Sequence, residues 1–202
     1  MSRALIAVAL ALAAPGLAQA DNHFLLELEA GLTSPIASDG EASAGTGFGG
    51  TFGFGGRIPG FAPAYYLVGR VAHSAYEVEG APRIGRPLVA HGELEIAVGG
   101  RMYLPLTQRL RLVLQVGFGE VFGESEVQRE GTRELLVESE TFALFAQGGL
   151  QFRMTDHFSL GAAADASFLP DRSDLEVARL ASGLDELAVG RTRLALTTTF
   201  HF

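Results

Sequence analysis

Apolar and polar residues alternate at every second position through much of this sequence. In the final stretch, Arg191–Phe202, one face carries leucine, phenylalanine and a threonine, and the other carries arginine, alanine, threonine and histidine. A period of two residues is that of a β-strand, whose successive side chains point to opposite sides. The pattern predicts eight strands, at about 23–32, 47–57, 64–76, 92–104, 109–119, 141–153, 158–168 and 188–202.

The predicted strands are long and strongly two-faced. Most have roughly ten to thirteen residues, whereas strands of globular proteins usually have about five or six. A tilted strand needs about nine to eleven residues to cross the hydrocarbon core of a membrane. An apolar strand that continues to the last residue would also be unusual in water, where chain ends fray. We therefore predict that the apolar face contacts lipid and the polar face lines a lumen.

The connections between the predicted strands alternate in length. Three are short and rich in turn residues, at 58–63, 105–108 and 154–157. Four are long, at 33–46, 77–91, 120–140 and 169–187. Tight inner turns and long outer loops are typical of a barrel whose two termini lie in the periplasm. The sequence thus predicts an all-β fold, an eight-stranded antiparallel up-and-down transmembrane β-barrel.

Aromatic residues support the lipid-facing assignment. On the apolar face they cluster at the two ends of the strands, at Tyr65, Phe152, Phe158, Phe200 and Phe202 on the turn side and at Phe48, Phe118, Phe142 and Phe168 on the loop side. Such rings mark the two interfaces of a membrane. A soluble lipocalin-like barrel would instead place its apolar face inside, around a ligand. The aromatic rings therefore favour the membrane barrel.

Residues 1–20 have the features of a secretory signal peptide. Arg3 precedes an apolar stretch, and Ala18-Gln19-Ala20 gives a small-x-small cleavage site. Residues 21–202 then form one barrel domain, and the formal charge of −8 becomes −9 without Arg3. This acidic balance argues against a nucleic-acid partner. The chain has no cysteine, which excludes disulfides and thiol chemistry.

The predicted lumen face carries many charged residues. They are Glu27, Glu29, Arg57, Arg70, Glu93, Glu95, Arg101, Arg109, Arg111, Arg153, Asp165, Arg191 and Arg193. The interior of an eight-stranded barrel is just wide enough for side chains to fill it, and buried charges there need partners. We expect a network of ion pairs that fills the lumen. A gated path or a polar binding cavity is the alternative interpretation.

Three further patterns have chemical interpretations that we do not favour. The carboxylate pairs Glu27/Glu29 and Glu93/Glu95 have a spacing that would suit acid–base catalysis or cation binding, but the many arginines predict neutralisation. The glycine-rich stretch 47–56 lies in a strand, whereas a phosphate-binding loop opens a helix. His157 and Ser159 lack an orienting partner and an oxyanion site. We therefore predict no catalytic, cofactor-binding or metal-binding residue.

Two of the long loops are candidates for binding an extracellular partner. Loop 120–140 is rich in glutamate with interspersed apolar residues, and it could be a hairpin that continues two strands beyond the membrane. In loop 169–187, Ser173 and Glu176 form a capping-box pattern that predicts a short helix at about 174–182. Solvated loops without a partner remain the alternative. Function in such scaffolds usually lies on the loops.

The signal peptide, the eight amphipathic strands, the alternating turns and loops and the aromatic end resemble the small outer-membrane β-barrels of the OmpA/OmpX type. In that superfamily the C-terminal aromatic strand is the recognition signal for the barrel-assembly machinery, and Leu196, Phe200 and Phe202 match it. The resemblance implies a location in the outer membrane of a Gram-negative bacterium, with membrane lipid and the assembly machinery as partners. No peptidoglycan-binding domain follows the last strand, so we do not expect a full OmpA-type anchor.

Three function classes are compatible with this sequence. We favour a structural or surface-interaction barrel that is not an enzyme. The second class is a small channel or a transporter of hydrophobic compounds. The third is an envelope lipid-modifying enzyme, because His157 and Ser159 are similar to the His-x-Ser pair of outer-membrane lipid A deacylases. That pair lies beside a periplasmic turn here and lacks the following asparagine, which argues against the third class.

Overall fold

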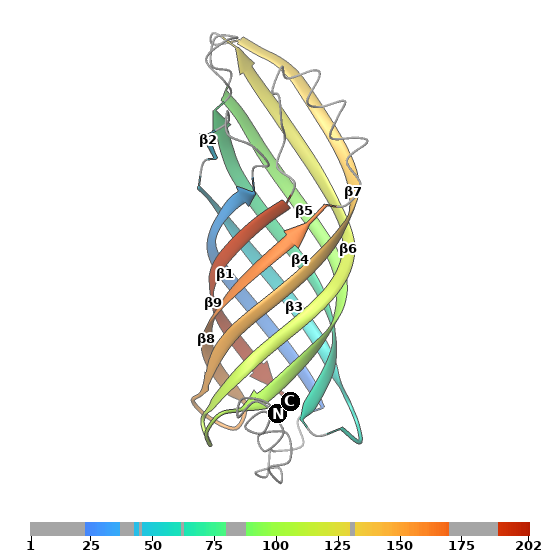
Figure 1. Cartoon of the computed structure of the whole chain (residues 1–202), viewed down its shortest axis with the longest axis vertical. Coiled ribbons are helices and arrows are strands. Elements are labelled where there is room, and N and C mark those ends of the chain that lie inside the picture. The colour runs from blue at the N-terminus through green and yellow to red at the C-terminus, as the bar shows by residue number, and fades with distance from the viewer. Residues whose placement is uncertain are drawn as a thin grey trace, which may run out of the picture.

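The chain forms a closed barrel of long antiparallel strands (Figure 1). The computed structural model describes residues 23–36, 43–44, 46–61, 63–79, 88–129, 132–169 and 190–202. The strands are β1 (Phe24–Ile36), β2 (Ser43–Ala44), β3 (Gly47–Ile58), β4 (Ala64–Glu79), β5 (Leu88–Pro105), β6 (Leu110–Arg129), β7 (Thr132–Arg153), β8 (Phe158–Phe168) and β9 (Gly190–His201). The described residues include no helix with the length and apolar character that a membrane crossing requires.

Eight of these strands make the barrel, and each pairs with its neighbours in sequence. The last strand, β9, pairs with β1 and closes the ring, while the two-residue strand β2 pairs with the end of β4. If paired residues are followed once around the barrel from Leu25, the path returns to Pro35, ten residues further along β1. This stagger tilts the strands, as closure of a barrel requires. The predicted eight-stranded up-and-down barrel is confirmed.

The two faces of the barrel are those that the alternation predicts. Most of the described leucine and phenylalanine side chains point outward and are exposed, with Leu194 at 64% and Leu196 at 74% relative exposure. Charged residues on the other face are buried, and Glu95 is fully inaccessible. An exposed belt of this kind would aggregate in water, so its natural solvent is lipid. The inside of the barrel is therefore the polar core of this protein.

Three short turns join the strands at one end of the barrel, which we call the turn end; the other end is the loop end. The turn end also holds Phe24 and Phe202, the first and last positions of the β1–β9 seam (Figure 1). In the turn between β3 and β4, Gly60 has a φ of 85°, a left-handed conformation that suits glycine after Pro59. All three predicted short turns are confirmed.

The stretch predicted as loop 120–140 is mostly strand. Strand β6 continues to Arg129 and β7 begins at Thr132, so the hairpin alternative is correct. Outside the membrane the outward positions need no apolar side chain, and glutamates replace the leucines that mark a strand elsewhere. The prediction of a long loop was wrong for this reason. The helix at about 174–182, most of loop 169–187 and the signal peptide lie outside the described residues.

Glycines on the inner face make room for Phe145, whose buried ring lies against β5 and β6. A Cβ atom at Gly117 would lie 2.5 Å from Cε1 of Phe145, and one at Gly99 would lie 3.0 Å from its Cζ. We expect Gly117→Ala to destabilise the barrel by about 1–3 kcal/mol, the usual cost of overpacking. Urea unfolding of refolded protein, followed by gel mobility without boiling, measures this. Gly100→Ala is the control, because its Cβ would point into open space.

Candidate functional site

The lower half of the lumen, toward the turn end, contains five buried charged residues. This lower ion cluster consists of Glu27, Glu29, Arg101, Asp165 and Arg193. Arg101 binds Glu27 with both terminal nitrogens, one of them at 2.6 Å from Oε2. Arg193 bridges two carboxylates, donating to Asp165 Oδ2 at 2.8 Å and to Glu29 Oε2 at 2.8 Å. The cluster thus contains three carboxylates and two guanidinium groups.

Neutral polar side chains complete the lower ion cluster. Glu27 also accepts hydrogen bonds from Thr199 at 2.8 Å and from Gln151 at 3.1 Å. Gln147 donates to Glu29 at 2.5 Å, and Gln115 accepts from Arg101 at 2.7 Å. Buried charges are tolerated when such hydrogen bonds satisfy their remaining lone pairs and protons. The alternation of the sequence places these glutamine and threonine residues on the inner face of the strands. It does not indicate that they form hydrogen bonds to the charged side chains.

The upper half of the lumen contains a second group of charges. This upper ion cluster consists of Arg70, Glu93, Glu95 and Arg191. Arg191 donates to Glu93 at 2.7 Å and to Glu95 at 2.5 Å, and Arg70 Nε donates to Glu95 at 2.6 Å. The guanidinium of Arg70 lies 3.8 Å from the centroid of the Phe145 ring. Two carboxylates face two guanidinium groups, so this cluster is formally neutral.

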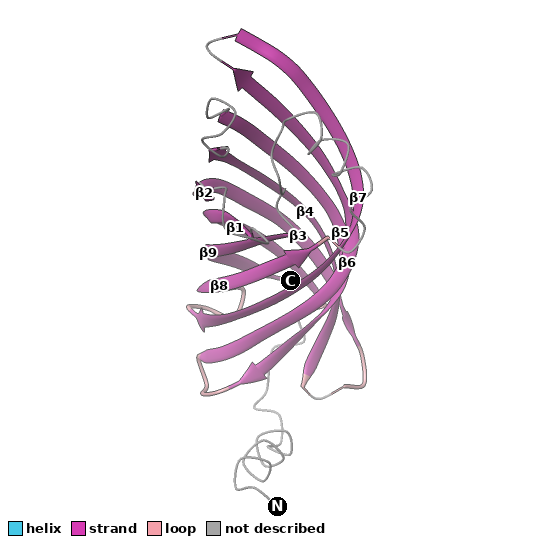
Figure 2. Cartoon of the chain, turned by 45° about the horizontal axis from the view of Figure 1, so that its top comes forward, coloured by secondary structure: helices cyan, strands magenta, loops and turns pink. Residues whose placement is uncertain are grey.

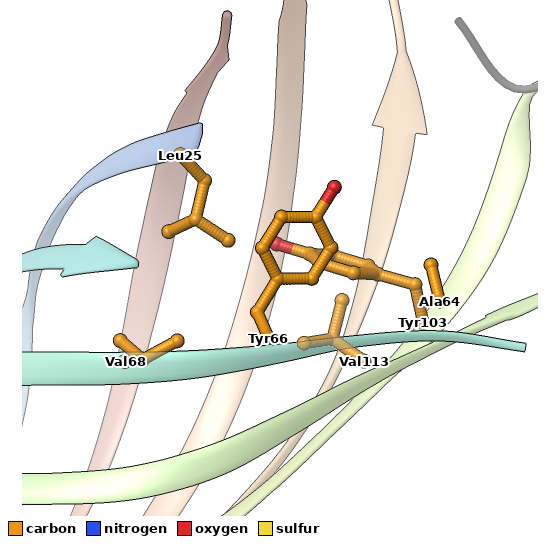
Figure 3. Packing of buried hydrophobic residues seen from close by; sticks show 6 residues of the cluster. All are labelled: Leu25, Ala64, Tyr66, Val68, Tyr103 and Val113. Atoms are coloured by element: carbon orange, nitrogen blue, oxygen red, sulfur yellow. The ribbon is translucent and has the colours of Figure 1, made fainter. Parts of the chain in front are cut away.

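An apolar and aromatic plug lies between the lower ion cluster and the turn end. Its buried members are Leu25, Ala64, Tyr66, Val68, Tyr103 and Val113 (Figure 3). The rings of Tyr66 and Tyr103 meet edge to face, with centroids 5.5 Å apart. Arg101 donates to the Tyr103 hydroxyl at 3.3 Å, which joins the plug to the ion cluster above it. The ion clusters and the plug are thus all built from buried side chains inside the barrel.

Among the described residues, three further members of the predicted lumen set, Arg109, Arg111 and Arg153, form no ion pair with either cluster. Arg109 lies in the turn before β6 and is exposed, because the strand begins one residue later than predicted. Arg153 binds Asp156 of the adjacent turn at 2.6 Å. Arg57 and Arg111 face inward at the turn end of β3 and β6. The expected single network is therefore two clusters and a separate group of arginines.

A cavity of about 1240 Å³ opens at the loop end. Its lining includes Tyr76, His91 and Glu93, and Glu93 accepts a hydrogen bond from Tyr76 at 2.8 Å and interacts with His91 at 3.1 Å. Exposed glutamates of β6 and β7, Glu124 and Glu138 among them, border it. Within the described part of the chain, no group of histidine and acidic residues has the arrangement of a metal site. The cavity is therefore an open, acidic mouth.

The residues of the proposed His-x-Ser pair lie apart. His157 is exposed in the turn before β8, where its Nδ1 lies 2.9 Å from the carbonyl oxygen of His201. Ser159 is buried inside the barrel and accepts a hydrogen bond from Arg111 at 2.6 Å. A catalytic serine needs a base within hydrogen-bonding reach of its hydroxyl. These contacts speak against a catalytic role for this pair of residues.

The residues of the predicted assembly signal lie on the outer surface. Leu196, Phe200 and Phe202 are 74%, 37% and 65% exposed, and all three follow the alternation of β9. The backbone of Phe202 closes the seam: its carbonyl accepts from His23 N at 2.7 Å and from Phe24 N at 3.0 Å. The side chain is thus available for recognition while the backbone is used for barrel closure. The recognition itself stays a prediction.

Solved structures show where this architecture occurs. Neisserial surface protein A has a TM-score of 0.57 to this chain at 14% identity, over 89% of this chain and 97% of its own. The outer-membrane protein OprG from Pseudomonas aeruginosa has a TM-score of 0.53 at 12% identity, over 91% and 99%. Ail, the attachment invasion locus protein of Yersinia pestis, has a TM-score of 0.52 at 12% identity, over 89% and 98%.

This chain has the fold of the small outer-membrane β-barrels of the OmpA/OmpX type. No family model matches its sequence, and a search of curated proteins finds no match either. The location that goes with this fold is the outer membrane of a Gram-negative bacterium, and the exposed belt of leucine and phenylalanine agrees with it. In an outer membrane, the arrangement typical of such barrels would place the turn end in the periplasm and the loop end outside, and this orientation stays a prediction.

Proposed function

We propose that this protein is a surface-interaction barrel whose binding element is the projecting hairpin, defined here as residues 118–129 of β6 and 132–142 of β7. The two strands have 20 and 22 residues, whereas β8 and β9 have 11 and 12. A membrane crossing uses about nine to eleven residues, so about half of each long strand remains outside. Figure 2 shows β6 and β7 extending furthest at the end opposite the turns.

The edge of the projecting hairpin supports this proposal. Strand β8 pairs with β7 only as far as Leu144. From Thr132 to Glu140, β6 is the only strand among the described residues that pairs with β7. An unpaired strand edge presents a row of backbone donors and acceptors that an extended segment of another protein can join. Such edges carry a risk of aggregation, and a binding role would explain an edge that no described strand covers.

The outer face of the projecting hairpin indicates the chemistry of the partner. Exposed glutamates alternate with phenylalanines across the two strands, so that Phe122 pairs with Glu140, and Glu124 pairs with Glu138. Like charges directly opposite each other destabilise a sheet. The same glutamates border the mouth cavity. We therefore propose an extended partner segment in which basic residues alternate with apolar ones.

The filled lumen favours this function over conduction. Both ion clusters and the plug are buried, and three ion pairs cross the lumen, from Arg101 of β5 to Glu27 of β1 and from Arg191 of β9 to Glu93 and Glu95 of β5. An ion that crosses the lumen would have to displace these pairs, each of which is costly to break in a buried setting. Single-channel recordings of refolded protein should show no conductance above background. Steady ohmic conductance would support the small-channel alternative instead.

Binding of defined peptides tests the proposed partner. We expect an alternating lysine–valine peptide to bind the full chain in nanodiscs, and an alternating glutamate–valine peptide to bind at least about tenfold more weakly, because several charge pairs of up to about 1 kcal/mol each are replaced by repulsion. Fluorescence anisotropy of labelled peptides measures both affinities. The double variant Glu124→Gln/Glu138→Gln should lose the preference for the basic peptide.

Two controls separate strand addition from simple charge attraction. Asp156→Asn removes an exposed carboxylate at the turn end and should leave binding unchanged. A lysine–valine peptide that is N-methylated at alternate residues keeps its charge but cannot form a strand ladder on its blocked edge. If this peptide binds as well as the unmodified one, the edge of β7 is not the docking site.

A further inference from the structure

Positively charged side chains gather at the turn end of the lumen. Arg57, Arg111 and Arg153 face the interior there, together with Ser159 and His201, and we call this group the turn-end mouth. Arg153 also binds the exposed Asp156 of the adjacent turn. The five buried carboxylates of the described residues all lie further up the barrel, in the two ion clusters. The interior at this end is therefore rich in arginine and poor in buried carboxylate.

Arg111 is the central residue of the turn-end mouth. It is half-buried, and its Nη2 donates to Ser159 Oγ at 2.6 Å and lies 2.6 Å from His201 Nε2. Its guanidinium lies 4.6 Å from the centroid of the Tyr103 ring. All of these partners are neutral, and its buried Nε has no hydrogen-bond partner within the described part of the chain. A largely buried guanidinium that is surrounded by neutral groups is costly unless an anion neutralises it.

His201 supplies a second unused donor beside Arg111. An arginine can only donate, so Nε2 of His201 accepts and its ring proton lies on Nδ1. The side chain is only 2% exposed, and Nδ1 has no hydrogen-bond partner among the described residues. Arg153 lies at the same end of the lumen, where its Nη2 binds Asp156 of the adjacent turn at 2.6 Å and its Nε donates to the carbonyl oxygen of Thr155 at 3.2 Å. Two buried donors and the charge of Arg111, which has no acidic partner among the described residues, are thus found at one end of the lumen.

We propose that the turn-end mouth is a binding site for a phosphate group. A tetrahedral oxyanion can accept from several donors at once, and a guanidinium presents its donors in a fork that matches phosphate oxygens. Arg111 provides the main charge, His201 provides a neutral donor, and Arg153 adds a charge that Asp156 already neutralises in part. The lipid-facing aromatic residues Phe24 and Phe202 place this mouth at the membrane interface. The phosphate is therefore either that of a phospholipid headgroup or inorganic phosphate.

Thermal unfolding of the refolded full chain in a non-ionic detergent tests the proposal. We expect sodium phosphate, at an ionic strength matched with sodium chloride, to raise the unfolding midpoint in a saturable manner. A second series replaces the phosphate by phosphatidylglycerol, with diacylglycerol of the same acyl chains as the comparison. Saturation with inorganic phosphate identifies the free ion as sufficient. A rise with phosphatidylglycerol but not with inorganic phosphate or diacylglycerol identifies the headgroup. No rise in either series overturns the proposal.

A matched pair of arginine variants locates the site. Arg111→Gln should weaken phosphate binding by about tenfold or more, as expected for the loss of a charge-assisted hydrogen bond. Arg109→Gln also removes one positive charge, but from an exposed side chain two positions before Arg111 in the sequence. This variant should leave the binding curve unchanged. If Arg111→Gln does not refold, Arg153→Gln takes its place and should weaken phosphate binding by a smaller factor, because Asp156 already neutralises part of the Arg153 charge. An unchanged binding curve for this variant would then overturn the site. Equal weakening by Arg109→Gln would show a diffuse charge effect and overturn the site.

Discussion

Replacement of Glu27 by glutamine is expected to destabilise the barrel by about 3–5 kcal/mol, the usual cost of breaking a buried ion pair. Among the described residues, Glu27 is the only carboxylate that binds Arg101, and it also accepts from Thr199 and Gln151. Without its charge, Arg101 would lose the one carboxylate among the described residues that it contacts directly. Urea unfolding of refolded protein, read from the gel mobility of unboiled samples, measures the loss.

Replacement of Glu29 by glutamine is the matched control for Glu27. The lower ion cluster has three carboxylates and two guanidinium groups, so one negative charge is in excess. Arg193 binds Asp165 as well as Glu29, and Asp165 remains in the variant. We expect a change of less than about 1 kcal/mol, the scale of one hydrogen bond. If Glu27→Gln and Glu29→Gln lowered the free energy of unfolding equally, the cluster would not contain an excess negative charge.

Deletion of Phe202 is expected to lower the amount of folded barrel in the outer membrane by about tenfold or more, because the seam between β1 and β9 loses three backbone hydrogen bonds of about 1 kcal/mol each. The lost bonds join Phe202 to His23 and Phe24. Quantification of the folded band in membrane fractions measures the effect.

Phe202→Ala separates barrel closure from recognition during assembly, because it keeps the backbone bonds and removes only the ring. If the aromatic ring is the assembly signal, this variant should refold in vitro with a near-normal urea midpoint but reach the membrane poorly in cells. Phe118→Ala is the control, since its ring is 53% exposed on the same outer surface but lies at the loop end. Normal levels of the Phe202→Ala variant would count against the assembly role.

The sequence predicted the barrel well because its main signal is local. A period of two residues is a property of each strand by itself, so the inner position of Glu27 or Arg193 follows from parity with its neighbours. The lengths of the turns follow equally from nearby residues such as Pro59 and Gly60. The pattern failed at the projecting hairpin, where both faces leave the lipid and glutamates occupy outward positions.

Partners within the lumen were decided by the tertiary structure. Arg101 and Glu27 are 74 residues apart, and their contact depends on the stagger of ten residues that closes the barrel. Stagger and strand tilt determine the height of each side chain along the barrel axis. The alternation of residues in the sequence gives the side of the sheet but carries no information on this height. Because the charged side chains lie at different heights in the barrel, they form two ion clusters and the turn-end mouth. The sequence by itself thus determined which side chains face the lumen and which face lipid, and only closure of the barrel decided which of them meet.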